Sequence, residues 1–171
     1  VEIGSEDATG PAELELAITG RTAAVAYVWV MRYWGLSLEQ VIEIAHARGV
    51  PVVLDAASEL PPVENLGRFI SMGADMVAFS GGKSIGGPQG SGVLCGRRDL
   101  VASAALQNLD QDIFFDQWNP PPGLFDKSKL RGLPQHGIGR ACKVGKEQVV
   151  GLLVAIQRFA HGSAETQHPQ Y

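Results

Sequence analysis

The sequence predicts an α/β fold, with a mainly parallel sheet and helices on both faces. Three observations support this prediction: short β-branched apolar runs, amphipathic stretches between them, and Ser or Gly residues where one pattern gives way to the other. Strands separated by helices of this length are typical of βαβ units, because parallel neighbours need a crossover connection. At 171 residues the chain is long enough to bury a substantial core.

The first half of the chain alternates helix and strand. Residues 11–18 predict a short helix, and the β-branched and aromatic run at 22–30 predicts a buried strand. Ser37 then caps a clear helix, with Gln40 three residues later completing a capping box. Gly49 ends this helix.

The second half continues the alternation. Strands are expected at 51–55, 76–79 and 91–95. Asn65 is expected to cap a helix that stops at Gly73. Further helices are expected at 100–109 and 146–160, the last with Val149, Leu152, Leu153, Ile156 and Phe159 on its apolar face. The region 110–137 is irregular.

Composition excludes several classes of protein. The net charge of −4 offers no electrostatic attraction to nucleic acid or to an anionic membrane. No apolar run approaches the roughly 20 residues that a transmembrane helix requires. Cys95 and Cys142 lack metal-type or CxxC spacing, so we expect no metal site. A reducing cytoplasm fits these features best.

Lys83 lies in a glycine-rich turn directly after a predicted strand. Ser80 stands three residues before it, Gly82 immediately precedes it, and Asp55 ends the preceding predicted strand. A lysine in this setting suits a Schiff base to an aldehyde cofactor, a hydroxyl suits the cofactor phosphate, and a carboxylate suits a pyridine nitrogen. We therefore predict pyridoxal 5'-phosphate as cofactor, with Lys83 and Asp55 catalytic and Ser80 and Gly82 contacting it.

Two other structures would produce a similar turn. A P-loop also contains Gly-Lys-Ser, but it needs a glycine five residues before Gly82, where Val77 stands. A surface lysine in a mobile loop is the second alternative, and it would be favoured for the turn taken alone. The combination with Asp55 and with the strand pattern favours the cofactor site.

The expected topology brings these residues to one place. In open α/β sheets, ligands bind outside the carboxyl ends of the strands. Asp55 and Ser80 fall at two such ends, and Lys83 follows in the connecting loop. Lys83 could then take the α-proton of an amino acid substrate. Elimination and replacement at Cβ share this step, and the residues do not separate them.

Five stretches carry a family resemblance: residues 1–4, 17–23, 54–62, 79–89 and 137–147. They resemble fold-type I pyridoxal phosphate enzymes, in particular the branch of bacterial selenocysteine synthase and D-glucosaminate-6-phosphate ammonia-lyase. The resemblance implies the large domain of a pyridoxal phosphate-dependent transferase fold. It also implies that Arg140 and Lys143 face an anionic substrate, the alternative being a solvated basic helix start.

The stretch after Asp55 is more similar to the ammonia-lyases. This implies a pyridoxal phosphate-dependent α,β-elimination on a phosphorylated amino-sugar acid or a similar amino acid. Two alternatives stay open: a β-replacement like that of L-seryl-tRNA selenium transferase, and a non-catalytic relative with the same fold. The negative net charge argues against a tRNA substrate.

The chain is expected to be incomplete, since it opens without a methionine, as if within a domain. Family members also have an upstream phosphate cradle and a carboxy-terminal small domain. We therefore expect residues 1–142 to be part of the cofactor-binding large domain, and 143–171 to be a linking helix and the start of the small domain. The fragment alone is not expected to hold the whole active site. The intact protein is expected to be a homo-oligomer that acts on a small anionic molecule.

Overall fold

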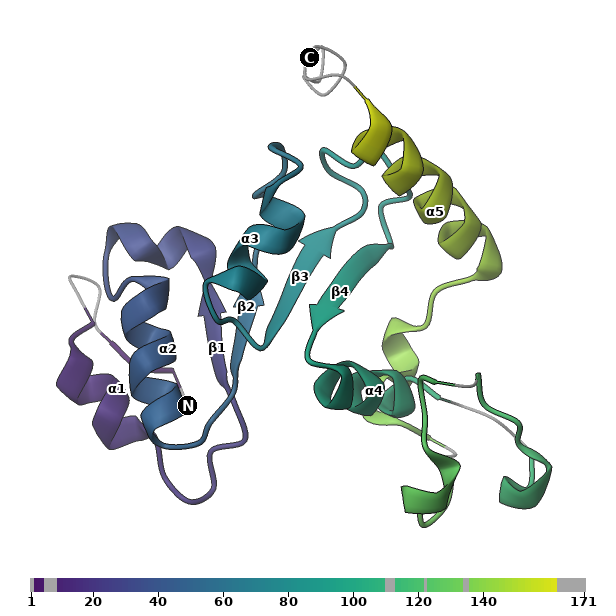
Figure 1. Cartoon of the computed structure of the whole chain (residues 1–171), viewed down its shortest axis with the longest axis horizontal. Coiled ribbons are helices and arrows are strands. Elements are labelled where there is room, and N and C mark those ends of the chain that lie inside the picture. Colours follow the sequence, from purple (N-terminus) through teal and green to yellow (C-terminus); the bar gives the residue numbers. More distant parts are fainter. Residues whose placement is uncertain (1, 5–8, 110–112, 122, 134–135, 163–171) are drawn as a thin grey trace.

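The chain forms one four-stranded sheet with helices packed around it (Figure 1). The computed structural model describes residues 2–4, 9–109, 113–121, 123–133 and 136–162. The strands are β1 (Val25–Val28), β2 (Val52–Asp55), β3 (Met76–Ser80) and β4 (Gly92–Gly96), in that order across the sheet. The first three run parallel, and β4 pairs antiparallel with β3. The predicted α/β class with a mainly parallel sheet is confirmed.

Helices alternate with these strands in the order that the sequence predicts. They are α1 (Pro11–Ala17), α2 (Leu38–Ala47), α3 (Asn65–Ser71), α4 (Arg98–Gln107) and α5 (Lys146–His161). The predicted capping box of α2 is present, because the Gln40 amide donates to Ser37 Oγ and the Ser37 amide donates to Gln40 Oε1. Among the described residues, no helix combines the length and apolar character needed to cross a membrane.

The first strand is shorter than the sequence predicts. Instead of filling 22–30, it is limited to Val25–Val28, and Trp29–Tyr33 forms a short 3₁₀ helix. The Trp29 ring packs against Phe69 of α3, with a centroid distance of 4.7 Å. Packing against a neighbouring helix therefore overrides the β propensity of this run.

Two helix predictions differ in detail from the structure. Asn65 is the first residue of α3 rather than its cap, and its side-chain amide donates to the Glu59 carbonyl at 2.6 Å. On α5, Val149 and Leu153 are exposed although the sequence places them on the packed face. Phe159 is buried there, as expected.

One face of the sheet carries most of the core. Side chains alternate between the faces of a strand, and partners in register share a face. The buried side chains on the core face are Tyr27, Val52, Leu54, Val77 and Phe79. Phe69 of α3 covers this face, with its ring 6.2 Å from that of Phe79. The opposite face includes the more exposed Val28 and Leu94, so the described helices bury one face more completely than the other.

A buried carboxylate joins several elements at the amino edge of the parallel strands. Asp75 directly precedes β3, and its oxygens lie 2.7 Å from His46 Nε2, 2.8 Å from the Val52 amide and 3.1 Å from Arg97 Nη1. Burial opposes the ionisation of Asp75, but these hydrogen bonds outweigh it and hold its pKa below the usual value. The carboxylate thus connects α2, β2 and the residue that follows β4.

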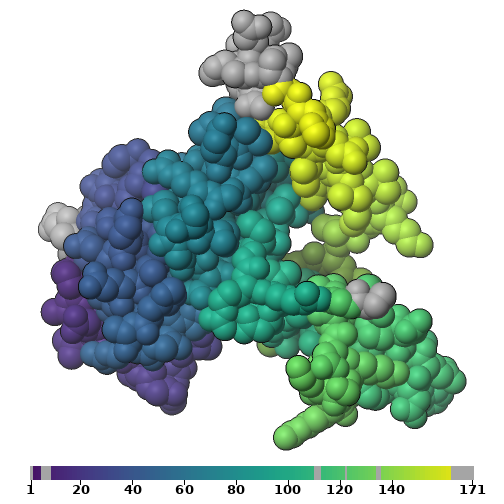
Figure 2. All heavy atoms as spheres, viewed as in Figure 1, coloured from purple at the N-terminus to yellow at the C-terminus, as the bar shows by residue number. Residues whose placement is uncertain are grey.

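The molecule is less compact after β4. Figure 2 shows that residues up to this strand form a continuous body, whereas the segment after α4 projects from it. Helix α5 returns to the body and contacts the turn between β3 and β4 (Figure 1). Of the second unit predicted at 143–171, residues 163–171 lie outside the described residues.

Candidate functional site

Asp55 and Ser80 end two neighbouring parallel strands at the carboxyl edge of the sheet. Asp55 pairs in register with Ala78, which lies two residues before Ser80. Because side chains alternate along a strand, Asp55, Ala78 and Ser80 share the face opposite the core. The structure therefore places both predicted residues on one face of one edge.

The turn after Asp55 is held by two hydrogen bonds. Asp55 Oδ1 accepts from the Ala57 amide at 2.9 Å, as in an Asx turn. The Ala56 amide donates to the carbonyl of Ala78 in the neighbouring strand at 2.9 Å. The Asp55 side chain remains exposed, so the carboxylate is fixed at the edge and is open to a ligand.

Residues 81–91 connect β3 to β4 in a turn held by its own backbone. The Gly87 amide donates to the Gly81 carbonyl, and the Gly86 amide donates to the Lys83 carbonyl, both at 2.8 Å. Gly86 has a φ of +74°, a conformation that glycine adopts without strain. The turn therefore presents Lys83 from a closed backbone loop.

Close packing explains the glycine pair before Lys83. A Cβ added to Gly81 would lie 2.4 Å from Ser91 Oγ and 2.7 Å from Leu152 Cδ1 of α5. A Cβ on Gly82 would lie 2.5 Å from Gln89 Cα. All three distances are shorter than a Cβ atom tolerates, so a larger residue at either position would force its neighbours to shift, and α5 supports the turn from outside.

The Lys83 side chain reaches across to the turn after Asp55. Its Nζ donates a hydrogen bond of 2.7 Å to Ser58 Oγ. The sequence analysis did not predict a role for Ser58. The signal that could have indicated one is a hydroxyl three residues after Asp55. The contact brings the lysine segment and the carboxylate segment together at the same edge.

These residues fit pyridoxal 5'-phosphate. The cofactor needs an amine for its aldehyde, an acid for its ring nitrogen and hydrogen-bond donors for its phosphate. Lys83 and Asp55 are both exposed, and Lys83 extends to the segment that carries Asp55. Ser80 and Gly82, which border the same turn, are the candidate phosphate contacts.

Arg140 and Lys143 lie elsewhere in this chain. Arg140 belongs to a 3₁₀ helix, Ile138–Cys142, that packs against α4, and Lys143 follows it. Helix α4 starts at the far end of β4 from the Lys83 turn (Figure 1). The contacts described for this 3₁₀ helix therefore do not bring it to the lysine.

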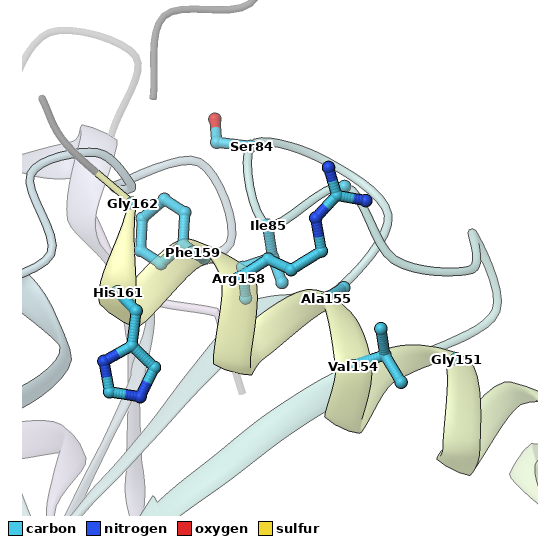
Figure 3. Close-up of a pocket in the computed structure, with 10 residues that line it drawn as sticks. Ser84, Ile85, Gly151, Val154, Ala155, Arg158, Phe159, His161 and Gly162 are labelled. Atoms are coloured by element: carbon cyan, nitrogen blue, oxygen red, sulfur yellow. The ribbon is translucent and has the colours of Figure 1, made fainter. Parts of the chain in front are cut away.

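A groove of about 590 Å³ lies between α5 and Ser84–Gly86, which directly follow Lys83. Figure 3 shows Arg158 extending from α5 on the side of Ser84 and Ile85, whereas the His161 ring points the opposite way. Asp55, Ser80 and Lys83 do not line this groove. It is separate from the predicted cofactor site.

Comparison with known proteins gives a family match over most of the chain. The aminotransferase class-V family matches residues 2–110, which include Asp55, Ser80 and Lys83. Pyridoxal phosphate is the cofactor of this family. The predicted family and its cofactor are thereby confirmed.

Individual relatives catalyse different reactions. A 5'-C-glycyluridine monooxygenase-decarboxylase from a Streptomyces species is 34% identical over 163 residues, which are 93% of this chain and 33% of that protein. The D-glucosaminate-6-phosphate ammonia lyase of Salmonella typhimurium is 32% identical over 165 residues, covering 95% of this chain and 36% of the lyase. The L-seryl-tRNA(Sec) selenium transferase of Moorella thermoacetica is 34% identical, with 70% of this chain and 28% of the transferase covered.

The fold of the chain also matches that of a solved structure. A structure of D-glucosaminate-6-phosphate ammonia-lyase superposes with a TM-score of 0.69 at 30% sequence identity, over 96% of this chain and 37% of that one. The chain thus spans about a third of the length of its first relatives. The sequence match and the shared fold agree, and the chain belongs to the aminotransferase class-V family.

Proposed function

We propose that the full-length protein is a pyridoxal phosphate-dependent lyase. Its reaction is an α,β-elimination on a phosphorylated amino-sugar acid or a similar amino acid: a proton leaves Cα, a leaving group departs from Cβ, and hydrolysis releases ammonia. The observation that carries this proposal is the 2.7 Å hydrogen bond from Lys83 Nζ to Ser58, beside the segment of Asp55. Similarity to D-glucosaminate-6-phosphate ammonia lyase supports the substrate class.

The proposed roles follow from the chemistry of each side chain. Pyridoxal phosphate, when bound, supplies an electron sink for the electron pair left at the substrate Cα. Lys83 is the attachment residue, and its Nζ takes the proton from Cα once the amine is free. Asp55, as a carboxylate, hydrogen-bonds the ring nitrogen and keeps it protonated. Ser80 and Gly82 donate hydrogen bonds to the phosphate.

The substrate anion is assigned to basic residues outside the turn. We propose that Arg140 and Lys143 bind it, with Arg140 providing a bidentate fork for phosphate. Their 3₁₀ helix packs against α4, which begins beyond the end of β4 that is distant from the Lys83 turn, so we propose a site completed by additional polypeptide. A homo-oligomer supplies such polypeptide.

The domain division also belongs to this proposal. We assign residues 1–142 to the cofactor-binding large domain and 143–171 to a linking helix and the start of a small domain. Four exposed apolar side chains on α5 support the proposal that further polypeptide covers this helix, because an exposed apolar surface is typical of an interface. They are Val149, Val150, Leu153 and Val154. The whole protein is proposed to be a cytoplasmic homo-oligomer.

The first test concerns the attachment residue. We expect Lys83→Ala in the full-length protein to abolish the visible absorption of the bound cofactor, its fixation by borohydride, and all turnover. Lys146→Ala removes another exposed lysine, at the start of α5, and is expected to retain all three. A Lys83→Ala protein in which borohydride still fixes the cofactor would show that another residue holds it.

The second test concerns the reaction. A panel of phosphorylated and unphosphorylated amino acids and amino-sugar acids, assayed for ammonia release, should favour the phosphorylated members. Arg140→Ala should reduce that preference. Equal activity on unphosphorylated members, unchanged by Arg140→Ala, contradicts the anion-binding role.

Two relatives suggest competing reactions, which are tested by adding seryl-tRNA with a selenium donor, and by measuring oxygen and carbon dioxide alongside ammonia. Activity only with seryl-tRNA and a selenium donor would favour the transferase reaction, although the net charge of −4 gives a polyanion little attraction. Oxygen consumption with release of carbon dioxide would favour a reaction like that of the monooxygenase-decarboxylase. Either result would replace the lyase assignment.

A further inference from the structure

The Ser58 side chain contacts the Lys83 amine, and the backbone that carries Ser58 is held by other contacts. The preceding residues are fixed by the bonds from Ala57 to Asp55 Oδ1 and from Ala56 to Ala78. On the other side, the Glu59 amide donates to the Ala56 carbonyl at 3.1 Å. These bonds fix the backbone on both sides of Ser58, so its Cβ is held at the carboxyl edge independently of Lys83.

Lys83 needs such a fixed partner. Its side chain is exposed, and a long lysine stem loses rotamer entropy when it is confined. The closed turn fixes the Lys83 backbone but leaves its four-carbon stem free to rotate. The hydrogen bond of 2.7 Å to Ser58 Oγ directs Nζ toward the edge where Asp55 lies.

A hydroxyl suits this task better than a carboxylate. Serine offers lone pairs as well as one O–H donor, whereas an ionised carboxylate can only accept. Ser58 therefore accepts from Lys83 when the amine is charged and can donate to it when the amine is neutral. A carboxylate at this position would favour the charged amine, which neither attacks an aldehyde nor removes a proton.

We propose that Ser58 is the positioning residue for Lys83, holding Nζ at the carboxyl edge in both of its protonation states. The inference rests on the proposed function, in which Lys83 is the attachment residue. Ser58 acts through Lys83 and determines how often the amine occupies the productive position.

The test measures how fast Lys83 captures pyridoxal phosphate in the cofactor-depleted full-length protein. Cyanoborohydride fixes the product, and peptide mass spectrometry reports labelling at Lys83 separately from other lysines. Ser58→Ala is expected to lower the labelling rate of Lys83 about tenfold at every pH at which the protein stays folded. Ser58→Thr keeps a hydroxyl and is expected to restore most of the rate.

Ser84→Ala is the matched control, because Ser84 is also a hydroxyl, it adjoins Lys83, and it lines the separate groove. It should leave Lys83 labelling unchanged. Equal rates in wild type and Ser58→Ala overturn the inference, as does an equal loss in Ser84→Ala or a failure of Ser58→Thr to restore the rate. If Lys83 is not labelled even in the wild type, the proposed function itself fails.

Discussion

The two edges of the sheet hold their acidic residues in opposite ways. At the amino edge, Asp75 is buried and lies within hydrogen-bond distance of His46, Val52 and Arg97. At the carboxyl edge, Asp55 is exposed and accepts from the backbone amide of its own turn. A carboxylate surrounded by protein donors stabilises the fold, whereas an exposed one on a fixed turn is available to a ligand. Substitutions at the two edges should therefore separate stability from chemistry.

The largest effect is expected at Asp55. Asp55→Asn should slow exchange of the substrate α-proton about 100-fold or more, because the cofactor ring nitrogen loses its charged partner. Thermal unfolding should change little, since the side chain is exposed. Glu43→Gln, an exposed carboxylate on α2, serves as control. An unchanged exchange rate would refute the role of Asp55.

The opposite pattern is expected at Asp75. Asp75→Ala should lower the free energy of unfolding by about 2–3 kcal/mol, because three donors lose a buried acceptor. Capture of pyridoxal phosphate by Lys83 should persist wherever the variant is folded. Asp99→Ala removes the exposed carboxylate that also contacts Arg97, and should cost much less. Urea denaturation of wild type and the two variants measures both differences. Equal losses in the two variants would contradict the stabilising role of the buried Asp75 carboxylate.

A smaller effect is expected in the Lys83 turn. Gly81→Ala should cost about 1–3 kcal/mol, because the added methyl group overlaps Ser91 and Leu152. It should also slow capture by Lys83, because the turn must shift. Gly90→Ala, whose added Cβ meets nothing within 4 Å, is the control. Unfolding midpoints that match in the two variants would show that the turn tolerates the overlap.

The smallest effect is a pH dependence. The pKa of Asp75 is lowered in the folded state, so its stabilising contribution is present above the unfolded pKa, near 4. That contribution is lost as the pH falls through the lower folded pKa, because protons then bind the unfolded state first. As the pH falls below about 4, the free energy of unfolding of the wild type should therefore decrease more than that of Asp75→Asn. Urea denaturation at a series of acidic pH values measures this difference. Parallel curves would contradict this origin.

Local patterns predicted the elements well. The capping box at Ser37 and the apolar period of α2 depend on residues close in sequence, and both are present. The placement of Asp55 and Ser80 on one edge follows from parallel strand order alone. These predictions needed no knowledge of tertiary contacts.

The features that sequence did not predict depend on distant contacts. Ser58 meets Lys83 because two turns from different strands approach each other. Trp29 leaves β1 to pack on Phe69 of another helix. Asp75 is buried beside partners that are distant in sequence: His46 of α2, Val52 of β2 and Arg97 after β4. The position of Arg140 follows an irregular segment that has no periodicity to interpret.

The antiparallel pairing of β4 also constrains how this region can evolve. Ser80 pairs with Gly92, so the turn that carries Lys83 begins and ends on the same pair of strands. Deleting a residue from 81–91 forces either a rebuilt turn or a one-residue shift of β4, and such a shift moves every β4 side chain to the other face. Homologous proteins that retain this pairing should therefore vary here by substitution, and insertions or deletions should collect elsewhere, as in the irregular segment after α4.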